Sequence, residues 1–458
     1  MEIFNNVHLV GAGGIGLSSV GKFLVHRGKR VTGSDARHNE ATAELERLGA
    51  VIRAGHTADN LPPDTDLLIY SDAVPPGNPE RSAAKERGVL QMSYFDFLGR
   101  FSSGRPTVGV SGTNGKSTTT AMLGTLLVGA GLDPTVIVGS KLKSFADGNL
   151  RVGSELTVIE ACEYRANMLK LSPETIVLTD VKPDHLDYYG DFEQIKKTFQ
   201  QYLNGLPSDG LLVWNADDPA SSELDHPARA VSYGIDSAAD YRAADIRVEP
   251  GRQVFQLLKS GEPLAEITLR VPGRFNVYNA LAALAAAHEY GADVESLKRS
   301  MGEFTGIWRR FEVVGQRGGA PVISDYAHHP DAVRGTIQAA RDFYPDRRVV
   351  VCFQPHHRNR TERLFDGFVE ALAAADVPLV TDIYEVAGRE REETGGVRGQ
   401  DLARAVAEYR GFEEAEVFAG SPEAARGKLK QVIEIDDVVI IMGAGDIYRI
   451  AEDLVDGT

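Results

Sequence analysis

Three times along this chain of 458 residues, a run rich in β-branched apolar residues breaks into glycines and continues as helix-like sequence. The segments are VHLVGAGGIGLSSVGKFL, TVGVSGTNGKSTTTAML and VVIIMGAGDIYRIAEDL. Each predicts a buried strand, a tight turn and a helix. Such units are typical of α/β domains with mostly parallel sheets, whose ligands bind where strand carboxyl ends meet helix amino ends. The predicted fold class is therefore α/β.

The sequence between these units alternates in the same way. Candidate strands DLLIYS, LTVIEA, TIVLTD, GLLVWN, RVVVCF and VPLVTD are separated by amphipathic stretches such as PERSAAKERG and DAVRGTIQAARDFY. Residues 241–272 differ, because DIRVEP, QVFQLLKS and AEITLRV are separated only by turn-forming residues. This segment predicts an antiparallel insertion.

The length of the chain predicts about three domains. Polar, glycine-containing sequence interrupts the pattern at 99–106 and 306–319, and each interruption precedes a new strand. We therefore expect domains over residues 1–104, 105–314 and 315–458.

The second glycine loop resembles a P-loop, although Val110 stands where the first glycine of that motif belongs. Its glycines expose backbone amides to phosphate oxygens, its lysine can reach the β and γ phosphates, and its serine hydroxyl suits magnesium. The loop predicts binding of ATP with Mg²⁺ by Gly112, Thr113, Asn114, Gly115, Lys116, Ser117 and Thr118. A GTPase is disfavoured because the chain has no Asn-Lys-x-Asp motif for reading guanine.

The first glycine loop satisfies the GxGxxG pattern after a predicted strand, and Asp35 follows at the distance typical of a dinucleotide site. The loop comprises Gly11, Gly13, Gly14, Ile15 and Gly16 together with Ala12. Missing side chains let backbone amides approach a diphosphate. NAD, FAD and a UDP-sugar all carry a diphosphate, and a purely structural turn also fits, so this pattern leaves the ligand open.

Magnesium on a nucleotide needs hard oxygen ligands beyond the loop. Two candidates follow strands: Glu160 in TVIEACEYR and the cluster around His185 in VLTDVKPDHLDYY. Either residue alone is an ordinary solvated group, but their combination with the P-loop favours a metal role.

Composition restricts the partners. Lysine and arginine number 49 against 65 acidic residues, a net charge of −16, which disfavours nucleic acid and anionic membranes. No stretch approaches the about 18 apolar residues of a membrane span. The amino terminus lacks a basic leader, and Cys162 and Cys352 are far apart in sequence, so we expect a cytoplasmic protein without a disulfide framework.

The order of motifs resembles the Mur ligase family over nearly the whole chain. The matching pieces are GTNGKSTTT, Glu160, KPDHLDYYG, PGRFNVYNALAA, RRFE and DYAHHP. The resemblance implies a Rossmann-like amino-terminal domain for the UDP moiety, a central P-loop ATPase-type domain and a Rossmann-like carboxyl-terminal domain. It also implies that the first loop, with Ser34, Asp35 and Ser71, faces a UDP-sugar and not NAD.

Within the family, the chain looks most like members that join L-alanine to the lactyl carboxylate of UDP-N-acetylmuramate through an acyl phosphate, in peptidoglycan precursor synthesis. The discriminating pieces are GAGGIGLS, EACEYRANML, DYAHHPDAVRGTI, FQPHHRNRT and TDIYEVAGRE. The loop departs from those members at Asn114, where they usually have histidine, and at Ser117, where threonine is commoner.

The resemblance also implies residue roles. Lys116 would contact the γ-phosphate, Ser117 and Glu160 would hold one magnesium, and His185 would bind a second. The remaining implied contacts are Asn279 to adenine, Arg310 and Asp325 to ATP, and His328, His356 and Arg360 to the muramate or the amino acid. The incoming amine also needs a proton acceptor, for which His328, His329 and Asp325 are candidates.

Two alternatives remain. A related muropeptide-recycling ligase adds a preformed tripeptide to the same UDP-sugar, but its motif usually reads FEPRS where this chain has FQPHH, beginning at Phe353. An NAD-dependent oxidoreductase would leave GTNGKST unexplained. The sequence leaves open whether the enzyme is a monomer or a homodimer, and whether alanine is preferred over glycine or serine.

Overall fold

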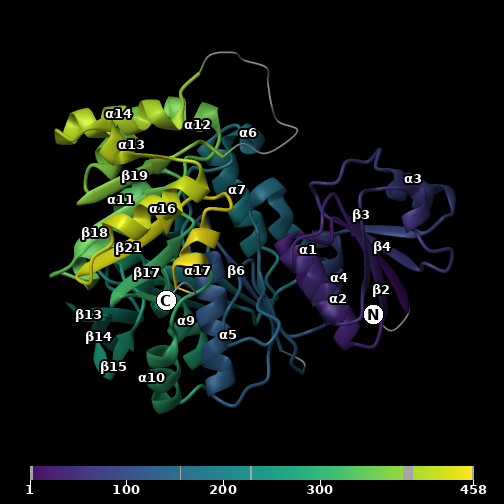
Figure 1. The fold of residues 1–458 in the computed structure, drawn as a ribbon. Coiled ribbons are helices and arrows are strands. Elements are labelled where there is room, and N and C mark those ends of the chain that lie inside the picture. Colours follow the sequence, from purple (N-terminus) through teal and green to yellow (C-terminus); the bar gives the residue numbers. More distant parts are fainter. Residues whose placement is uncertain (1–3, 155, 227–228, 385–395, 456–458) are drawn as a thin grey trace. The chain divides into compact units, whose positions relative to one another are not determined.

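The computed structural model describes residues 4–154, 156–226, 229–384 and 396–455 (Figure 1). The chain divides into two compact units. The first comprises Met1–Asp245, Phe255–Ile267 and Phe275–Gly302, and the second comprises Ile246–Val254, Thr268–Arg274 and Glu303–Thr458. The fold is mixed α/β with three sheets, in agreement with the predicted class.

The amino-terminal sheet has the strand order β3-β2-β1-β4-β5, and every neighbouring pair is parallel. Its strands bury both faces, because Leu9 and Ile69 point into one core cluster while Val10 and Leu68 point into another. The elements are β1 (Asn6–Val10), α1 (Ile15–His26), β2 (Arg30–Asp35), α2 (Glu40–Arg47), β3 (Val51–Ala54), the 3₁₀ turn η1 (Ala58–Asn60), β4 (Leu67–Tyr70), α3 (Pro79–Glu86), β5 (Leu90–Ser93) and α4 (Tyr94–Ser102).

The second sheet has ten strands in the order β15-β14-β13-β12-β11-β10-β6-β9-β7-β8. The P-loop strand β6 (Thr107–Ser111) lies between β9 (Thr157–Glu160) and β10 (Thr175–Leu178) and is parallel to both. The other elements of this region are α5 (Lys116–Gly129), β7 (Thr135–Ile137), β8 (Leu150–Arg151), η2 (Tyr164–Lys170), α6 (Leu186–Tyr189), α7 (Phe192–Leu203), β11 (Leu211–Asn215), α8 (Pro219–Ser222), β12 (Ala230–Gly234), α9 (Arg274–Glu289) and α10 (Val294–Glu303).

The predicted antiparallel insertion is present as three consecutive strands at one edge of this sheet. They are β13 (Tyr241–Glu249), β14 (Arg252–Lys259) and β15 (Glu262–Leu269). Only two residues separate each neighbouring pair, and a two-residue connection can join only antiparallel strands. Both turns use left-handed backbone, with φ of 75° at Gly251 and 51° and 86° at Ser260 and Gly261.

The six-stranded sheet of the second unit has the order β16-β17-β21-β18-β19-β20, with only β16 antiparallel to its neighbour. Its central strands alternate between two cores, since Val351 and Phe353 face one cluster while Val350 and Cys352 face the other. The elements are β16 (Glu312–Arg317), β17 (Ala320–Asp325), α11 (Pro330–Phe343), β18 (Arg348–Phe353), α12 (Arg358–Arg363), α13 (Phe365–Leu372), β19 (Val377–Thr381), α14 (Gly399–Arg410), α15 (Glu414–Val417), β20 (Phe418–Gly420), α16 (Pro422–Val432), β21 (Asp437–Met442) and α17 (Tyr448–Val455).

The three predicted strand-turn-helix units are confirmed as β1-α1, β6-α5 and β21-α17. The predicted domain cuts at about 104 and 314 stay predictions, because the contact-based division has two units. One core cluster of the first unit includes Phe101 from α4 and Phe199 from α7, which explains why these regions count as one compact body.

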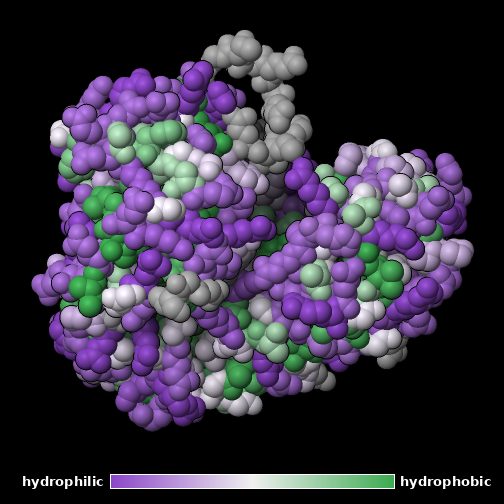
Figure 2. All heavy atoms as spheres, in the orientation of Figure 1, coloured by the Kyte–Doolittle hydropathy of each residue, from purple (hydrophilic) through white to green (hydrophobic). Residues whose placement is uncertain are grey.

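The surface and the helices were compared with what a membrane-spanning protein requires. Figure 2 shows that hydrophilic residues make up most of the visible face. Among the described residues, no helix is both long enough and apolar enough to cross a membrane.

Close packing of β1 against β2 generates a test of the amino-terminal sheet. A Cβ added at Gly33 would lie 2.7 Å from the carbonyl oxygen of Leu9, a backbone atom that cannot move away cheaply. We expect Gly33→Ala to lower the free energy of unfolding by about 1–3 kcal/mol. Urea unfolding followed by circular dichroism measures this loss. Gly77→Ala is the control, because nothing lies within 4 Å of its added Cβ, and equal stability of the two variants would contradict the packing argument.

Candidate active site

Three strand ends meet beside the P-loop. Strands β9, β6 and β10 are adjacent and parallel, so the segments that follow them emerge at the same edge of the sheet. These segments carry Glu160, the GTNGKST loop and Asp180. The P-loop is therefore flanked on both sides by carboxylates, as expected for a site at the carboxyl ends of parallel strands.

The loop ends at the amino terminus of α5. Gly115 has a φ of 82° and precedes the helix without any side-chain cap, which leaves first-turn amides available to an anion. Asn279 of α9 lies directly beside it, since its Oδ1 accepts a hydrogen bond from Thr119 at 3.3 Å. The predicted adenine contact is thus next to the phosphate loop.

Asn114 is held by a carboxylate from the neighbouring strand. Its backbone N–H and its Nδ2 donate to the two oxygens of Asp180, at 2.7 and 3.0 Å, and its carbonyl accepts from the Thr179 hydroxyl at 2.6 Å. The N–H of Thr113 donates to the carbonyl of Asp180 at 3.0 Å. Burial raises the pKa of Asp180. Asn114 therefore fixes the shape of the loop.

Lys116 folds back onto its own loop. Its Nζ donates to the carbonyls of Gly112 and Thr113, at 2.7 and 2.9 Å, and forms an ion pair of 2.8 Å with Oε2 of Glu163. Burial opposes the charged form, but the carboxylates of Glu163 and Glu160 prevail and raise the pKa of Lys116. The lysine is a cation, and it must exchange partners to reach a phosphate.

Ser117 and Glu160 are brought together, as predicted. The hydroxyl of Ser117 donates to Oε2 of Glu160 at 2.8 Å, and the N–H of Gly139 donates to the same oxygen at 2.8 Å. A hydroxyl and a carboxylate are hard oxygen ligands of the type that Mg²⁺ prefers. The donor set therefore fits magnesium beside the P-loop.

His185 lies in a second acidic group. Its Nε2 is 3.6 Å from Oε1 of Glu163 and 3.7 Å from Oδ2 of Asp184, and ligand atoms of the three residues lie within 4.8 Å of one another. The ring of Tyr164 packs 4.6 Å from the imidazole, centroid to centroid. Sequence reasoning missed Glu163, although the second acidic residue of EACE, in a segment singled out for the family resemblance, was a usable signal.

The first loop satisfies much of its own hydrogen bonding. The amides of Gly11 and Ala12 both donate to the carbonyl of Ser34 at 2.9 Å, and Gly13 donates to the Asp35 carboxylate at 2.8 Å. Helix α1 then begins at Ile15 without a side-chain cap. A diphosphate would meet this first turn. Asp35 shapes the loop, whereas the dinucleotide fingerprint expects it on a ribose.

Ser34 and Ser71 differ in what they offer to a ligand. The Ser34 hydroxyl is fully buried and donates to Glu80 at 2.7 Å, so its side chain is turned into the domain. Glu80 also contacts His8 at 2.7 Å and His56 at 3.2 Å, which forms a polar network that the sequence did not reveal. Ser71 directly follows the end of β4, and its N–H donates to Val10 at 3.0 Å beside the loop.

In the second unit, Asp325 anchors a strained turn. Its two oxygens accept from the N–H groups of Phe311 and Ala327, both at 2.7 Å. Phe311 and Arg309 have positive φ, 48° and 56°, and the turn exposes Arg310 between them. Arg309 is buried and donates to the carbonyl of Gly443. Asp325 thus positions the predicted ATP contact Arg310.

The predicted substrate residues gather at the carboxyl ends of β17 and β18. The imidazole rings of His328 and His356 are 6.4 Å apart, and Arg360 Nη1 is 3.5 Å from Nδ1 of His356. Burial, with neighbouring cationic groups, lowers the pKa of His356 to about 4 and also lowers the pKa of His328. Both imidazoles are therefore neutral near pH 7, beside a permanent guanidinium.

The tautomer of His328 follows from its contact. Its Nδ1 lies 2.9 Å from the carbonyl of Tyr326, and a carbonyl oxygen can only accept. Nδ1 therefore carries the proton, and Nε2 is a free base. His329 instead approaches the N–H of Asp331 at the start of α11. Part of the TDIYEVAGRE match, residues 385–390, lies outside the described residues.

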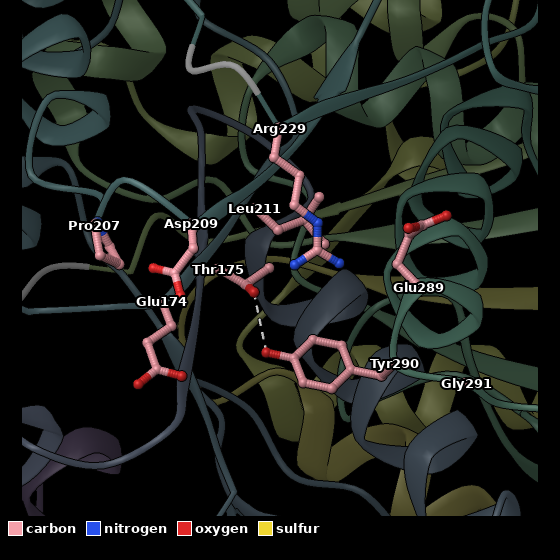
Figure 3. A pocket seen from close by; sticks show the side chains of 10 residues that line it. Glu174, Thr175, Pro207, Asp209, Leu211, Arg229, Glu289, Tyr290 and Gly291 are labelled. Atoms are coloured by element: carbon pink, nitrogen blue, oxygen red, sulfur yellow. Dashed lines mark hydrogen bonds between the residues drawn. The ribbon is translucent and has the colours of Figure 1, made fainter.

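A cavity of about 620 Å³ lies elsewhere in the first unit (Figure 3). It is lined by Thr175 and Leu211, the first residues of β10 and β11, with Arg229 and Tyr290. Tyr290 and Thr175 hydroxyls are 3.0 Å apart. The cavity is therefore at the amino ends of these strands, away from the P-loop edge, and is no part of the predicted site.

Comparison with known proteins places this site in a family. Three family models match consecutive parts of the chain: the Mur ligase family catalytic domain over residues 6–105, the Mur ligase middle domain over 110–287, and the Mur ligase glutamate ligase domain over 309–445. The chain belongs to the Mur ligase family.

Several full-length relatives carry one name. The UDP-N-acetylmuramate–L-alanine ligase of Aquifex aeolicus is 38% identical over 99% of this chain and 97% of its own length, and that of Salinibacter ruber is 39% identical over 98% and 94%. The crystal structure of the UDP-N-acetylmuramate-alanine ligase of Thermotoga maritima has a TM-score of 0.85 at 29% identity, covering 99% of this chain and 98% of that one. A murein peptide ligase of Psychrobacter arcticus has a TM-score of 0.68 at 24% identity and 98% coverage of both chains, so it shares the fold.

The histidine environment generates a pH prediction. We expect His356 to titrate near pH 4, because burial and nearby cations disfavour its protonated form. In the unfolded chain the pKa of this histidine is near its ordinary value of 6.5. The contribution of His356 to stability is thus complete above about pH 6.5 and is lost as the pH falls toward 4. The Cε1–H resonance, assigned with His356→Asn, should stay constant between pH 8 and 6, and a midpoint near 6.5 would contradict the prediction.

Proposed function

We propose that this protein joins L-alanine to the lactyl carboxylate of UDP-N-acetylmuramate through an acyl phosphate, with cleavage of ATP to ADP and phosphate, in peptidoglycan precursor synthesis. The observation that carries the proposal is the P-loop with Lys116, flanked by the Ser117–Glu160 pair and by the His185 group. The full-length similarity to ligases of that name supports the choice of substrates.

The first step activates the carboxylate. An oxygen of the lactyl carboxylate attacks the γ-phosphorus, and the bond to ADP breaks, which gives an acyl phosphate. Lys116 offsets charge on the transferring phosphoryl group once it releases its loop carbonyls. Ser117 and Glu160 would hold one magnesium and His185 a second, and these ions would supply further charge neutralisation. Asn279, beside the loop, is proposed to read the adenine.

The second step forms the amide. The neutral amine attacks the acyl carbon, the tetrahedral intermediate collapses, and phosphate leaves. The amine must lose a proton, and Nε2 of His328 is a suitable acceptor because its pKa is lowered and its Nδ1 is already protonated. Arg360 is proposed to meet a substrate carboxylate with its forked guanidinium, alongside His356.

The first loop supplies the other ligand site. The uncapped start of α1 is proposed to receive the diphosphate of the UDP-sugar, with Ser71 and the loop backbone beside it. We further propose that the enzyme works in the cytoplasm, as a monomer or a homodimer.

The reaction is tested by release of inorganic phosphate. Purified protein with ATP, Mg²⁺ and UDP-N-acetylmuramate should release phosphate only when an amino acid is added, with L-alanine best and glycine and L-serine weaker. Turnover with the preformed tripeptide and not with alanine would instead identify a recycling ligase. Reduction of NAD would overturn the ligase proposal.

The P-loop lysine is tested separately. Lys116→Ala should reduce phosphate release by about 10³-fold or more, since it removes a cation from the transferring phosphoryl group. UDP-N-acetylmuramate binding, measured by calorimetry, should persist because that ligand is proposed to bind the first loop. Lys197→Ala, on the exposed side of α7, is the matched control. Full activity of Lys116→Ala would contradict the assigned role.

A further inference from the structure

Glu163 lies between the P-loop lysine, which is assigned to ATP, and His185, which is assigned to a metal ion. One carboxylate oxygen forms an ion pair with the P-loop lysine, and the other is 3.6 Å from the imidazole of His185. Its side chain is only 6% exposed. A carboxylate so deeply buried is costly without partners, so its contacts bear on how this part of the site works.

Hydrogen bonds hold the backbone of Glu163 in place, whereas its carboxylate has two neighbours, Lys116 and His185, between which it can shift. The main-chain carbonyl accepts from the Tyr189 hydroxyl and from the N–H of Ala166, and Arg165 and Ala166 that follow have φ of 53° and 56°. Apart from the 2.8 Å ion pair with Lys116, Oε2 has no hydrogen-bond partner among the described residues. A rotation of this side chain alone would move its charge from the lysine toward His185.

Lys116 cannot serve ATP in the arrangement seen here. Its three N–H groups face two carbonyls of its own loop and Glu163, which are three acceptors. A γ-phosphate must therefore draw the lysine away from at least one of them. Of the three, Glu163 is the one whose loss leaves a buried negative charge without a cation.

We propose that Glu163 holds Lys116 before nucleotide binds and then, when ATP takes the lysine, becomes with His185 and Asp184 a ligand of a divalent cation. This cation is the second one that the family resemblance already implies at His185, separate from the one at Ser117 and Glu160, and the new element is the exchange of partners by Glu163. Its affinity is coupled to that of the nucleotide, because Lys116 and the cation compete for one carboxylate. The inference rests on the proposed function only in taking ATP as the ligand of the P-loop.

The chemistry of the group suits a small hard cation. Two carboxylates and an imidazole lie within 4.8 Å of one another, compared with about 3 Å between neighbouring ligands around octahedral magnesium. The side chains must therefore draw together as the ion arrives. Without nucleotide, the positive charge of Lys116 beside Glu163 opposes that step.

The experiment counts ions and measures nucleotide affinity on the full chain, without turnover. Mn²⁺ binding is followed by the electron paramagnetic resonance signal of the free ion, with a non-hydrolysable ATP analogue present. The wild type should bind two ions per chain, and Glu163→Gln should bind one. Calorimetry without metal should show Glu163→Gln binding the analogue about three- to tenfold more tightly, because Lys116 is released and a negative charge is removed.

A second variant separates the two roles of the carboxylate. His185→Asn should also lose the second ion, but its metal-free affinity for the analogue should equal that of the wild type, since the Lys116–Glu163 ion pair persists. Glu193→Gln removes an exposed carboxylate, 67% accessible, and should change neither quantity.

Either of two results would overturn the inference. One is two bound ions in both Glu163→Gln and His185→Asn, and the other is weaker metal-free binding of the analogue by Glu163→Gln with unaltered thermal unfolding. If Glu163→Gln does not fold, the same two measurements on Glu163→Ala, which also removes the carboxylate, decide. A wild type that binds no ATP analogue would instead contradict the proposed function, so the two failures are distinguishable.

Discussion

The parallel pairing of buried strands is the constraint on which the sites of this protein depend. In the amino-terminal sheet and in the six-stranded sheet, core clusters cover both faces of the central strands, whose side chains are mostly apolar. The groups assigned to the nucleotide site therefore gather where strands end. The P-loop, Glu160 and Asp180 follow three adjacent parallel strands, and Asp325 ends a strand of the second unit.

Much of this arrangement could be predicted from the sequence, because the ends of the strands can be recognised in it. The GTNGKST loop and Glu160 each follow a short β-branched run, and the family resemblance implies the pairing of Ser117 with Glu160 that the structure contains. The antiparallel insertion could also be predicted. Only a few turn-forming residues separate its strands, which is too few for the crossover connection that parallel strands require.

The rest depended on contacts that no local pattern encodes. Glu163 lies in the irregular segment after β9, where neither strand nor helix periodicity predicts the direction of a side chain. Ser34 was expected to face a nucleotide, but its hydroxyl is bound by Glu80, which is distant in sequence. The tautomer of His328 likewise follows from the Tyr326 carbonyl and not from the residue type.

The Asn114–Asp180 contact has a consequence for how these two positions vary among homologous sequences. The two residues are separated by 66 positions but share two hydrogen bonds, one through the side-chain amide of Asn114. A replacement of Asn114 that lacks a donor leaves a half-buried carboxylate one partner short, and that deficit is relieved most simply by a change at Asp180. The two positions are therefore expected to covary among homologues. Asn114 is then expected to be one half of a compensated pair.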